Sequence, residues 1–363
     1  METSLFDYDL PRERIAQQPA AERDASRLLV VHRDTRTIEH RHFSDLIDYI
    51  RPSDHLFRNA ARVLPARIFA YRQTGGRVEC LLLRPGSSDP KSNCEDWWCL
   101  LKPGRKLPAG STFAFEDAFS ATVEEKNEQA EYRVRFELPQ GSSVARIAET
   151  LGKMPLPPYI EREREDNRDP DDKDRYQTIY AHSEKAVAAA APTAGLHFTE
   201  ELTRSIQSTG ATFHDLILHV GMGTFKPLDE GSVEDHEIHR EIYEIPATAQ
   251  HALRQARATN QRRICIGTTS VRTVEDYLRK TDSVHDAGFN SEAGLFVYPP
   301  VIFTGVDALV TNFHMPKSTL LCLVSGFLSP GKTDGIDWLK SIYAEAIRME
   351  YRFLSYGDAM LIL

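Results

Sequence analysis

The sequence predicts an α/β domain together with a smaller all-β domain that we expect to be a barrel. From Tyr176 onward, apolar runs of strand length alternate with helical patterns, which is the order of an α/β sheet. Residues 66–138 instead carry short β-rich runs separated by turn residues. The 363 residues are enough for two ordinary domains, and 41% hydrophobic with 27% charged residues is the composition of a globular protein.

The all-β region contains the β-rich runs Ala66–Tyr71, Val78–Leu83 and Tyr132–Leu138. Gly75-Gly76 between the first two predicts a hairpin, and Lys102-Pro103-Gly104-Arg105 predicts a turn after a further run. Short strands joined by such turns are typical of a small closed barrel.

A charged connection follows the all-β region. Leu156–Tyr159 and the charge-dense run Glu161–Arg175 mark the return to a different domain. Such a run is typical of a solvated loop, and its alternative role is a mobile lid. Ala188–Ala191 predicts a tightly packed segment.

Strand, polar loop and helix then recur in the α/β region. Strands are predicted over Phe213–Val220, Arg263–Ile266 and Ala308–Phe313, with helices Val271–Lys280 and Pro316–Leu328 after the last two. Ligands of such sheets bind at the carboxyl ends of the strands, so we expect the chemistry in the loops that follow them.

The sequence indicates both the start and the end of one further helix. It is predicted over Glu200–Ser208, with Thr199 as its N-cap and Gly210 just after its end.

Two of the strand-to-helix loops are rich in polar groups. Gly267–Arg272 offers backbone N–H groups and hydroxyls at a helix N-terminus, which suits an anion or a carboxylate, although simple capping by Ser or Thr is the alternative. Thr311–Ser318 repeats the arrangement with further polar side chains. Neither loop has the spacing of a P-loop.

Four of the thirteen histidines are candidates to converge: His197, His219, His236 and His239. Histidines that only fill polar pockets are the plain alternative. His236-x-x-His239 also permits a zinc site, but no third ligand has a recognisable spacing and we predict no metal.

Composition restricts the compartment and the partners. The chain has 53 acidic and 44 basic side chains, a formal net charge of -9, so any nucleic-acid contact must come from a local patch. No run approaches eighteen apolar residues, and the first ten residues carry Glu2, Asp7 and Asp9 where a signal peptide would carry basic residues. We therefore expect a cytoplasmic protein without membrane contact, and interpret its five cysteines as free thiols.

Six blocks in a fixed order resemble those of a known family. They are Ala191–Phe198, His219–Phe225, Glu234–His239, Gly267–Arg272, Thr311–Leu320 and Tyr351–Leu361, and the opening Phe6–Pro11 with Arg23–Val30 is similar to the N-terminal signature of the same family. The chain resembles, over nearly its whole length, the S-adenosylmethionine:tRNA ribosyltransferase-isomerases of queuosine biosynthesis.

The resemblance implies both a fold and a reaction. The fold would be an α/β domain built from both chain ends, residues 1–64 and 151–363, with a β-barrel inserted at residues 65–150. The reaction would transfer the ribosyl part of S-adenosylmethionine to 7-aminomethyl-7-deazaguanine at the wobble position of tRNA. Adenine and methionine would be released and epoxyqueuosine formed. S-adenosylmethionine is then a ribosyl-donor substrate, and for the assembly we favour a monomer.

This chemistry needs a base near the ribose C5′ hydrogens, which the sulfonium acidifies, and an acid for the leaving adenine. We expect both to come from His219, His236 and His239, with Asp235 and Glu241 orienting rings or accepting protons. Which histidine is the base stays open.

Substrate contacts are expected from three groups of residues. Thr268, Thr269, Ser270 and Arg272 are suited to the methionine carboxylate, Asn312, His314 and Lys317 to ribose or adenine, and Gly195 and His197 belong to a shared block. Phe198 and Phe225 are candidate aromatic faces. For tRNA we expect Arg58, Arg62 and Arg67, with Arg162, Arg164 and Arg168 in the charged run.

The chain also departs from the family pattern. It reads Asn59-Ala60-Ala61-Arg62 where the family usually has Asn-Asp-Thr-Arg, so a carboxylate and a hydroxyl are missing. This motivates an alternative, a non-catalytic tRNA-binding paralogue. A third hypothesis is a metal-dependent nucleotide hydrolase that uses His236 and His239.

Overall fold

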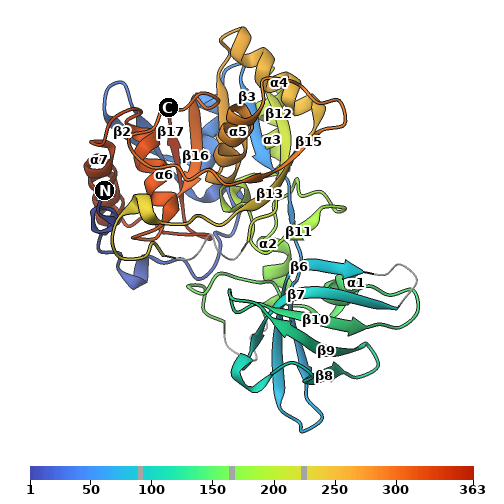
Figure 1. Ribbon diagram of the computed structural model, residues 1–363. Coiled ribbons are helices and arrows are strands. Elements are labelled where there is room, and N and C mark those ends of the chain that lie inside the picture. Colours follow the sequence, from blue (N-terminus) through green and yellow to red (C-terminus); the bar gives the residue numbers. More distant parts are fainter. Residues whose placement is uncertain (89–92, 163–167, 222–226) are drawn as a thin grey trace.

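The computed structural model describes residues 1–88, 93–162, 168–221 and 227–363. The chain forms a large α/β body and a separate β-barrel attached to it (Figure 1). Strands from both ends of the sequence share the large sheet, while the barrel comes from the early middle of the chain. The predicted fold class, an α/β domain built from both chain ends with an inserted barrel, is confirmed.

Six strands close the barrel in the order β10-β7-β6-β5-β8-β9. They are β5 (Arg67–Tyr71), β6 (Arg77–Ser88), β7 (Cys94–Lys102), β8 (Thr112–Phe115), β9 (Phe119–Lys126) and β10 (Tyr132–Glu137). The predicted hairpin lies between β5 and β6, and the predicted turn after β7 is the short 3-10 helix η5 (Gly104–Lys106). Helix α1 (Val144–Leu151) adds its apolar face to the barrel core, with its first turn capped by Ser143.

The main sheet has nine strands in the order β15-β13-β12-β3-β14-β16-β17-β1-β2. They are β1 (Arg27–His32), β2 (Thr37–His42), β3 (His55–Asn59), β12 (Thr212–Leu218), β13 (Glu241–Ile245), β14 (Arg263–Ile266), β15 (Phe289–Ala293), β16 (Ala308–Asn312) and β17 (Ala359–Ile362). The central strands β12, β3, β14 and β16 are parallel. Strand β17 lies between β16 and β1, so it joins the last part of the chain to the first.

Helices cover both faces of this sheet, which is why its central strands are apolar on both sides. One face packs against α4 (Ala247–Ala258), α5 (Thr268–Lys280), α6 (Thr319–Leu328) and α7 (Gly335–Arg348). The other face packs against α3 (Glu200–Ser208) and the 3-10 helix η4 (Phe43–Tyr49). The predicted bounds and N-cap of α3 are confirmed, because the Thr199 hydroxyl accepts from the Leu202 N–H.

Several short elements lie in the connections between the longer strands and helices. Strand β4 (Arg62–Val63) pairs with β11 (Ala186–Ala188), and α2 (Asp169–Arg175) lies in the connection after the barrel. Further 3-10 helices in the described part of the chain are η1 (Thr3–Phe6), η2 (Arg12–Arg14), η3 (Arg23–Ala25), η6 (Thr193–His197) and η8 (Val233–Asp235).

Three sequence predictions need correction. Helix α5 begins at Thr268 rather than Val271, because Gly267 with a φ of 88° turns the chain directly into the helix. Helix α6 begins at Thr319 rather than Pro316, since the Ser318 side chain caps it. The charged run is more than a solvated loop, because α2 falls within it and its Asp172 is buried.

Within the described ranges, no helix has the length and apolar character needed to cross a membrane. None of the five cysteines, all of which are described, forms a disulfide.

Candidate active site

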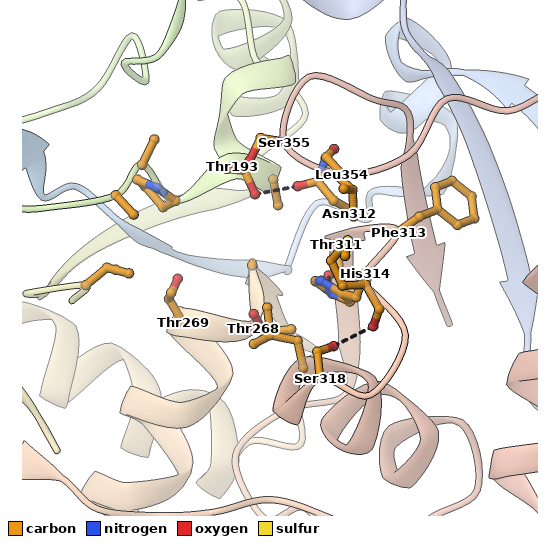
Figure 2. Close-up of a pocket in the computed structure, with 18 of the residues that line it drawn as sticks. Thr193, Thr268, Thr269, Thr311, Asn312, Phe313, His314, Ser318, Leu354 and Ser355 are labelled. Carbon is orange, nitrogen blue, oxygen red and sulfur yellow. Dashed lines mark hydrogen bonds between the residues drawn. The ribbon is translucent and has the colours of Figure 1, made fainter. Parts of the chain in front are cut away.

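A cavity of about 430 Å³ opens at the carboxyl ends of β14 and β16, where the sequence predicted the chemistry. Its volume lies within the range of small-molecule sites. Figure 2 shows Thr268, Thr269 and Ser318 on one side, Thr193 and Ser355 on the other, and Thr311, Asn312 and His314 between them. The remaining lining is mostly apolar: Pro158, Tyr159, Ala190, Ala191, Pro192, Ala194, Val220, Pro227, Gly267, Phe313, Met315, Pro316, Leu320 and Leu354.

The first turn of α5 forms one wall of the cavity. Gly267 donates its N–H to the Val310 carbonyl at 2.8 Å, which fixes the end of β14 against β16. The first N–H groups of any helix lack an intrahelical acceptor, and here no N-cap side chain supplies one. Thr269 is one of the residues that line the cavity (Figure 2), and its buried hydroxyl has no hydrogen-bond partner among the described residues. This wall is therefore suited to an anionic group.

The end of β16 supplies the second polar wall. The Asn312 carboxamide oxygen accepts from the Thr193 hydroxyl at 2.8 Å, and its NH₂ group lies 3.0 Å from His197 Nε2. The other ring nitrogen of His197 lies 2.7 Å from the Ser26 hydroxyl. Burial, followed by the charges of Arg352 and Arg23, lowers the pKa of His197 to about 3. His197 is therefore neutral and fixes Asn312 from behind the cavity wall.

His314 lines the cavity directly. Its Nε2 lies 2.9 Å from the Thr311 hydroxyl, and burial lowers its pKa to about 3. Across the cavity, Tyr159 and Ser355 hydrogen-bond through their hydroxyls at 2.7 Å, and burial raises the pKa of Tyr159 to about 12. None of the described lining residues is Asp, Glu, Lys or Arg. A ligand therefore meets neutral hydroxyl, amide and imidazole groups together with the N-terminus of α5.

His219 lies next to the cavity, because its neighbour Val220 is part of the lining. Its Nε2 is 3.5 Å from a carboxylate oxygen of Glu244, which also binds Lys185 at 2.5 Å. Burial lowers the pKa of His219, while the Glu244 carboxylate acts against that shift. The result is a half-buried imidazole that is neutral at pH 7 and has a carboxylate ready to stabilise its protonated form.

The structure does not bring the other members of the histidine pool into the described cavity lining. His236 packs edge-on against Phe296, with ring centroids 5.5 Å apart, and its Nδ1 is 3.9 Å from Asp229. His239 and Asp235 lie exposed on the connection before β13. Within the described part of the chain, no three His, Cys, Asp or Glu side chains group as metal ligands would.

Glu241 and Arg272 form a buried ion pair between β13 and α5. The second carboxylate oxygen of Glu241 accepts from the Gly221 N–H at 2.9 Å. Arg272 also donates to backbone carbonyls, including that of Ala293 at 3.3 Å. Neither residue lines the cavity, so this pair holds the strand, the helix and the Gly221 backbone together.

Three further predicted contacts also lie outside the lining. Ser270 is buried and donates its hydroxyl to the Ile266 carbonyl at 2.8 Å. Lys317 pairs with Asp7 at 3.1 Å. Gly195 packs so closely against Tyr180 that a side chain at this position would collide with it. Phe198 belongs to the core beneath α3, and Phe225 falls outside the described residues.

Ala60 and Ala61, where the chain departs from the family pattern, are not among the residues that line the cavity. Both alanines are fully buried and pack with Ala188 and Ile217 in a small apolar cluster. The preceding Asn59 is retained, and its side-chain oxygen accepts from the Ala61 and Leu218 N–H groups at 3.0 Å each. The replacement therefore removes no group from the described cavity lining.

The arginines expected to contact tRNA have different surroundings. Arg58 pairs with Asp215 at 2.6 Å and covers the Tyr180 ring, and Arg62 makes a forked ion pair with Glu149. Arg67 faces a second cavity between the barrel and the main body. Arg162 binds buried Asp172 at 2.7 Å. Arg164 lies outside the described residues, and Arg168 is half-buried at the start of α2.

Sequence reasoning did not single out Tyr159, Thr193, Ser355 or Glu244. Tyr159 and Ser355 are almost 200 positions apart, and only the tertiary fold joins them. Glu244 can be recognised as a site residue only from the pairing of β13 with β12, because that pairing places its carboxylate beside His219.

The fold is an open α/β sheet with a barrel inserted early in the chain, and an uncharged cavity with a few hydroxyl, amide and imidazole groups lies at the carboxyl ends of its strands. Together these features define a two-domain enzyme of small-molecule chemistry. The model of the family described as queuosine biosynthesis protein matches residues 3–362. The chain belongs to this family.

Several similar proteins carry the same name. Proteins of Thermotoga maritima and Staphylococcus haemolyticus, both named S-adenosylmethionine:tRNA ribosyltransferase-isomerase, are 42% and 41% identical to the chain over the full length of each. The one from Symbiobacterium thermophilum is 43% identical, again over both full lengths. The crystal structure of S-adenosylmethionine tRNA ribosyltransferase from Thermotoga maritima aligns with a TM-score of 0.54 and 34% identity, covering 99% of this chain and 100% of that one.

Proposed function

We propose that the protein transfers and isomerises the ribosyl group of S-adenosylmethionine onto 7-aminomethyl-7-deazaguanine at the wobble position of tRNA. The products would be epoxyqueuosine in the tRNA, adenine and methionine. The observation that carries this proposal is the full-length similarity, at 41–43% identity, to proteins named S-adenosylmethionine:tRNA ribosyltransferase-isomerase.

The 430 Å³ cavity is the proposed site for S-adenosylmethionine. Its carboxylate would bind at the first turn of α5, where Thr269 has an unused buried hydroxyl and the backbone N–H groups carry partial positive charge. Asn312 and His314 would contact the ribose or adenine, supported by the hydrogen bonds that fix both side chains. Arg272, which we expected at the carboxylate, is instead assigned to positioning α5.

His219 is the proposed base. The sulfonium acidifies the ribose C5′ hydrogens, and a neutral imidazole can accept one of them. The lowered pKa of His219 supports this role, because the ring is then unprotonated at pH 7. Glu244, 3.5 Å away, would stabilise the imidazolium that forms. His236 and His239, the other two histidines of the pool, are the proposed sources of the acid that protonates departing adenine, since the low pKa values of His197 and His314 make those two rings poor proton donors.

The proposal is tested by a single-turnover reaction with S-adenosylmethionine and tRNA that carries 7-aminomethyl-7-deazaguanine. Released adenine and the mass of the modified base are followed together. We expect equal amounts of adenine and epoxide-bearing base, and no adenine when the tRNA carries unmodified guanine. Tight tRNA binding without adenine release would refute catalysis and favour the non-catalytic paralogue.

Two additions sharpen the experiment. His219→Gln should abolish adenine release, whereas His251→Gln, a change of an exposed histidine on α4, should leave the rate unchanged. Activity should also persist in excess chelator. Loss of activity with chelator, restored by a metal, would contradict the proposal and revive the metal-dependent alternative.

A further inference from the structure

A second cavity of about 550 Å³ lies between the barrel and the segment that leads back to the main body. Its charged lining consists of five basic and two acidic side chains, an excess of three positive charges in a chain whose net charge is -9. The lining residues are Arg67, Phe69, Arg77, Glu79, Lys102, Pro103, Lys153, Met154, Leu156, Arg162 and Asp172. We call this cavity the junction groove.

Both acidic groups of the junction groove already have cationic neighbours. Asp172 accepts two hydrogen bonds from Arg162, at 2.7 and 2.9 Å. Glu79 lies 3.4 Å from Arg67. Arg77 and Lys102 are exposed, and no acidic side chain among the described residues lies within ion-pair distance of either. The charge excess is therefore concentrated on the barrel side of the groove.

Aromatic side chains alternate with these cations on the outer face of the barrel. Between β5 and β6, Tyr71 lies opposite Arg77 and Phe69 lies opposite Glu79. Between β6 and β7, Glu79 lies opposite Lys102. Directly paired residues point to the same side of a sheet, so these five side chains form one surface. The Arg77 guanidinium lies 4.0 Å from the centre of the Phe69 ring, and Tyr71 is 50% exposed.

The junction groove and the candidate active site share one short segment of chain. Leu156 lines the groove, whereas Pro158 and Tyr159 line the active-site cavity. A polymer whose reacting unit enters the active-site cavity would therefore have its neighbouring units close to the groove. Exposed cations interleaved with aromatic faces are the features that bind single-stranded nucleic acid, through phosphates and stacked bases.

We propose that the junction groove binds the single-stranded RNA that flanks the base being modified. Arg77 and Lys102 contact backbone phosphates, and the exposed ring of Tyr71, at the edge of the groove beside Arg77, stacks with a base. This inference rests on the proposed function, because it takes the polymer to be the tRNA anticodon loop. It adds a binding site on the barrel that the reaction chemistry itself does not require.

The test measures binding of an anticodon stem-loop RNA to the full-length protein over a range of salt concentrations. The variant Arg77→Glu/Lys102→Glu is compared with the control Arg257→Glu/Lys332→Glu, which makes the same charge change at exposed sites on α4 and in the loop before α7. We expect the first variant to bind at least about tenfold more weakly and the slope of log K against log salt to fall by about 1.4, which is two phosphates at about 0.7 each. Tyr71→Ala should weaken binding without changing that slope.

Equal binding and equal salt slopes for both double variants would overturn the inference. If the glutamate variant does not fold, as judged by thermal unfolding, Arg77→Gln/Lys102→Gln provides the same comparison with uncharged side chains of similar length. The readout is RNA binding and not turnover. If the wild-type protein binds the stem-loop but releases no adenine, the proposed function is refuted. The RNA-binding comparison of the variants would still test the junction groove.

Discussion

The buried pair between Glu241 and Arg272 offers a prediction about how the active site is held together. Changing Glu241 to Gln keeps the size of the side chain and an oxygen for the Gly221 N–H, but leaves the Arg272 guanidinium buried without a carboxylate. The side chains of Arg272 and Glu241 are only 8% and 4% exposed, so water cannot replace the lost partner. Removing one member of such a pair costs about 3–5 kcal/mol in free energy of unfolding.

Scanning calorimetry provides the measurement. For a domain of this size, about 3–5 kcal/mol corresponds to a fall of about 10 °C in the unfolding temperature of the α/β domain. Arg348→Gln, which breaks an exposed pair with Glu345 on α7, serves as the control and should change that temperature little.

The double variant Glu241→Leu/Arg272→Met separates charge from shape. It removes both charges, so it should be less destabilised than Glu241→Gln, although the Gly221 N–H loses its acceptor at a cost of about 1–3 kcal/mol. An unfolding temperature of Glu241→Gln within about 2 °C of the wild type would refute a structural role for the pair.

Three further predictions concern single side chains. Thr269→Val should weaken S-adenosylmethionine binding, measured by calorimetry, about tenfold, as expected for one lost hydrogen bond to a charged group. The control Thr203→Val on α3 should leave the affinity unchanged. Equal affinities for the two variants would contradict the carboxylate site. The rate of adenine release should fall as pH drops through the lowered pKa of His219. Because the Glu244 carboxylate raises that pKa, Glu244→Gln should move the fall in rate to lower pH. An unchanged pH profile would contradict the interaction between Glu244 and His219. His197, with a pKa of about 3 when folded and about 6.5 when unfolded, takes up a proton only on unfolding, so the protein should lose stability as pH falls from about 6.5 towards 3. His197→Gln should flatten that dependence in urea titrations, and an unchanged dependence would argue against a buried neutral ring.

Local signals allowed much of the fold to be predicted. Helix α3 was located correctly because its cap, its apolar face and its terminal glycine lie within a dozen residues. The start of α5 was missed, since Gly267 in a left-handed conformation enters the helix without any side-chain cap. The burial of Asp172 was not predictable either, because one of its partners, Tyr356, is 184 positions away.

The candidate site was predictable in part for the same reason. The sequence indicates which end of the sheet carries the chemistry, and Thr268, Thr269, Asn312 and His314 do line the cavity there. It does not indicate how deep a side chain lies along a helix. Arg272 is one turn beyond Thr268, where it meets Glu241 of β13 instead of the ligand cavity.

The position of β17 has a consequence for how the protein is made. Residues 359–362 pair with β16 on one side and with β1 on the other, and all four are buried. During synthesis, β1 and β2 therefore cannot join the rest of the sheet until residues 359–362 have left the ribosome. The apolar strand β1 is exposed throughout that interval, which is the period when chaperone binding would be expected. Nascent chains arrested before residue 359 should be cleaved by protease within β1, whereas the 363-residue chain followed by a linker long enough to bring residues 359–362 out of the ribosome should resist.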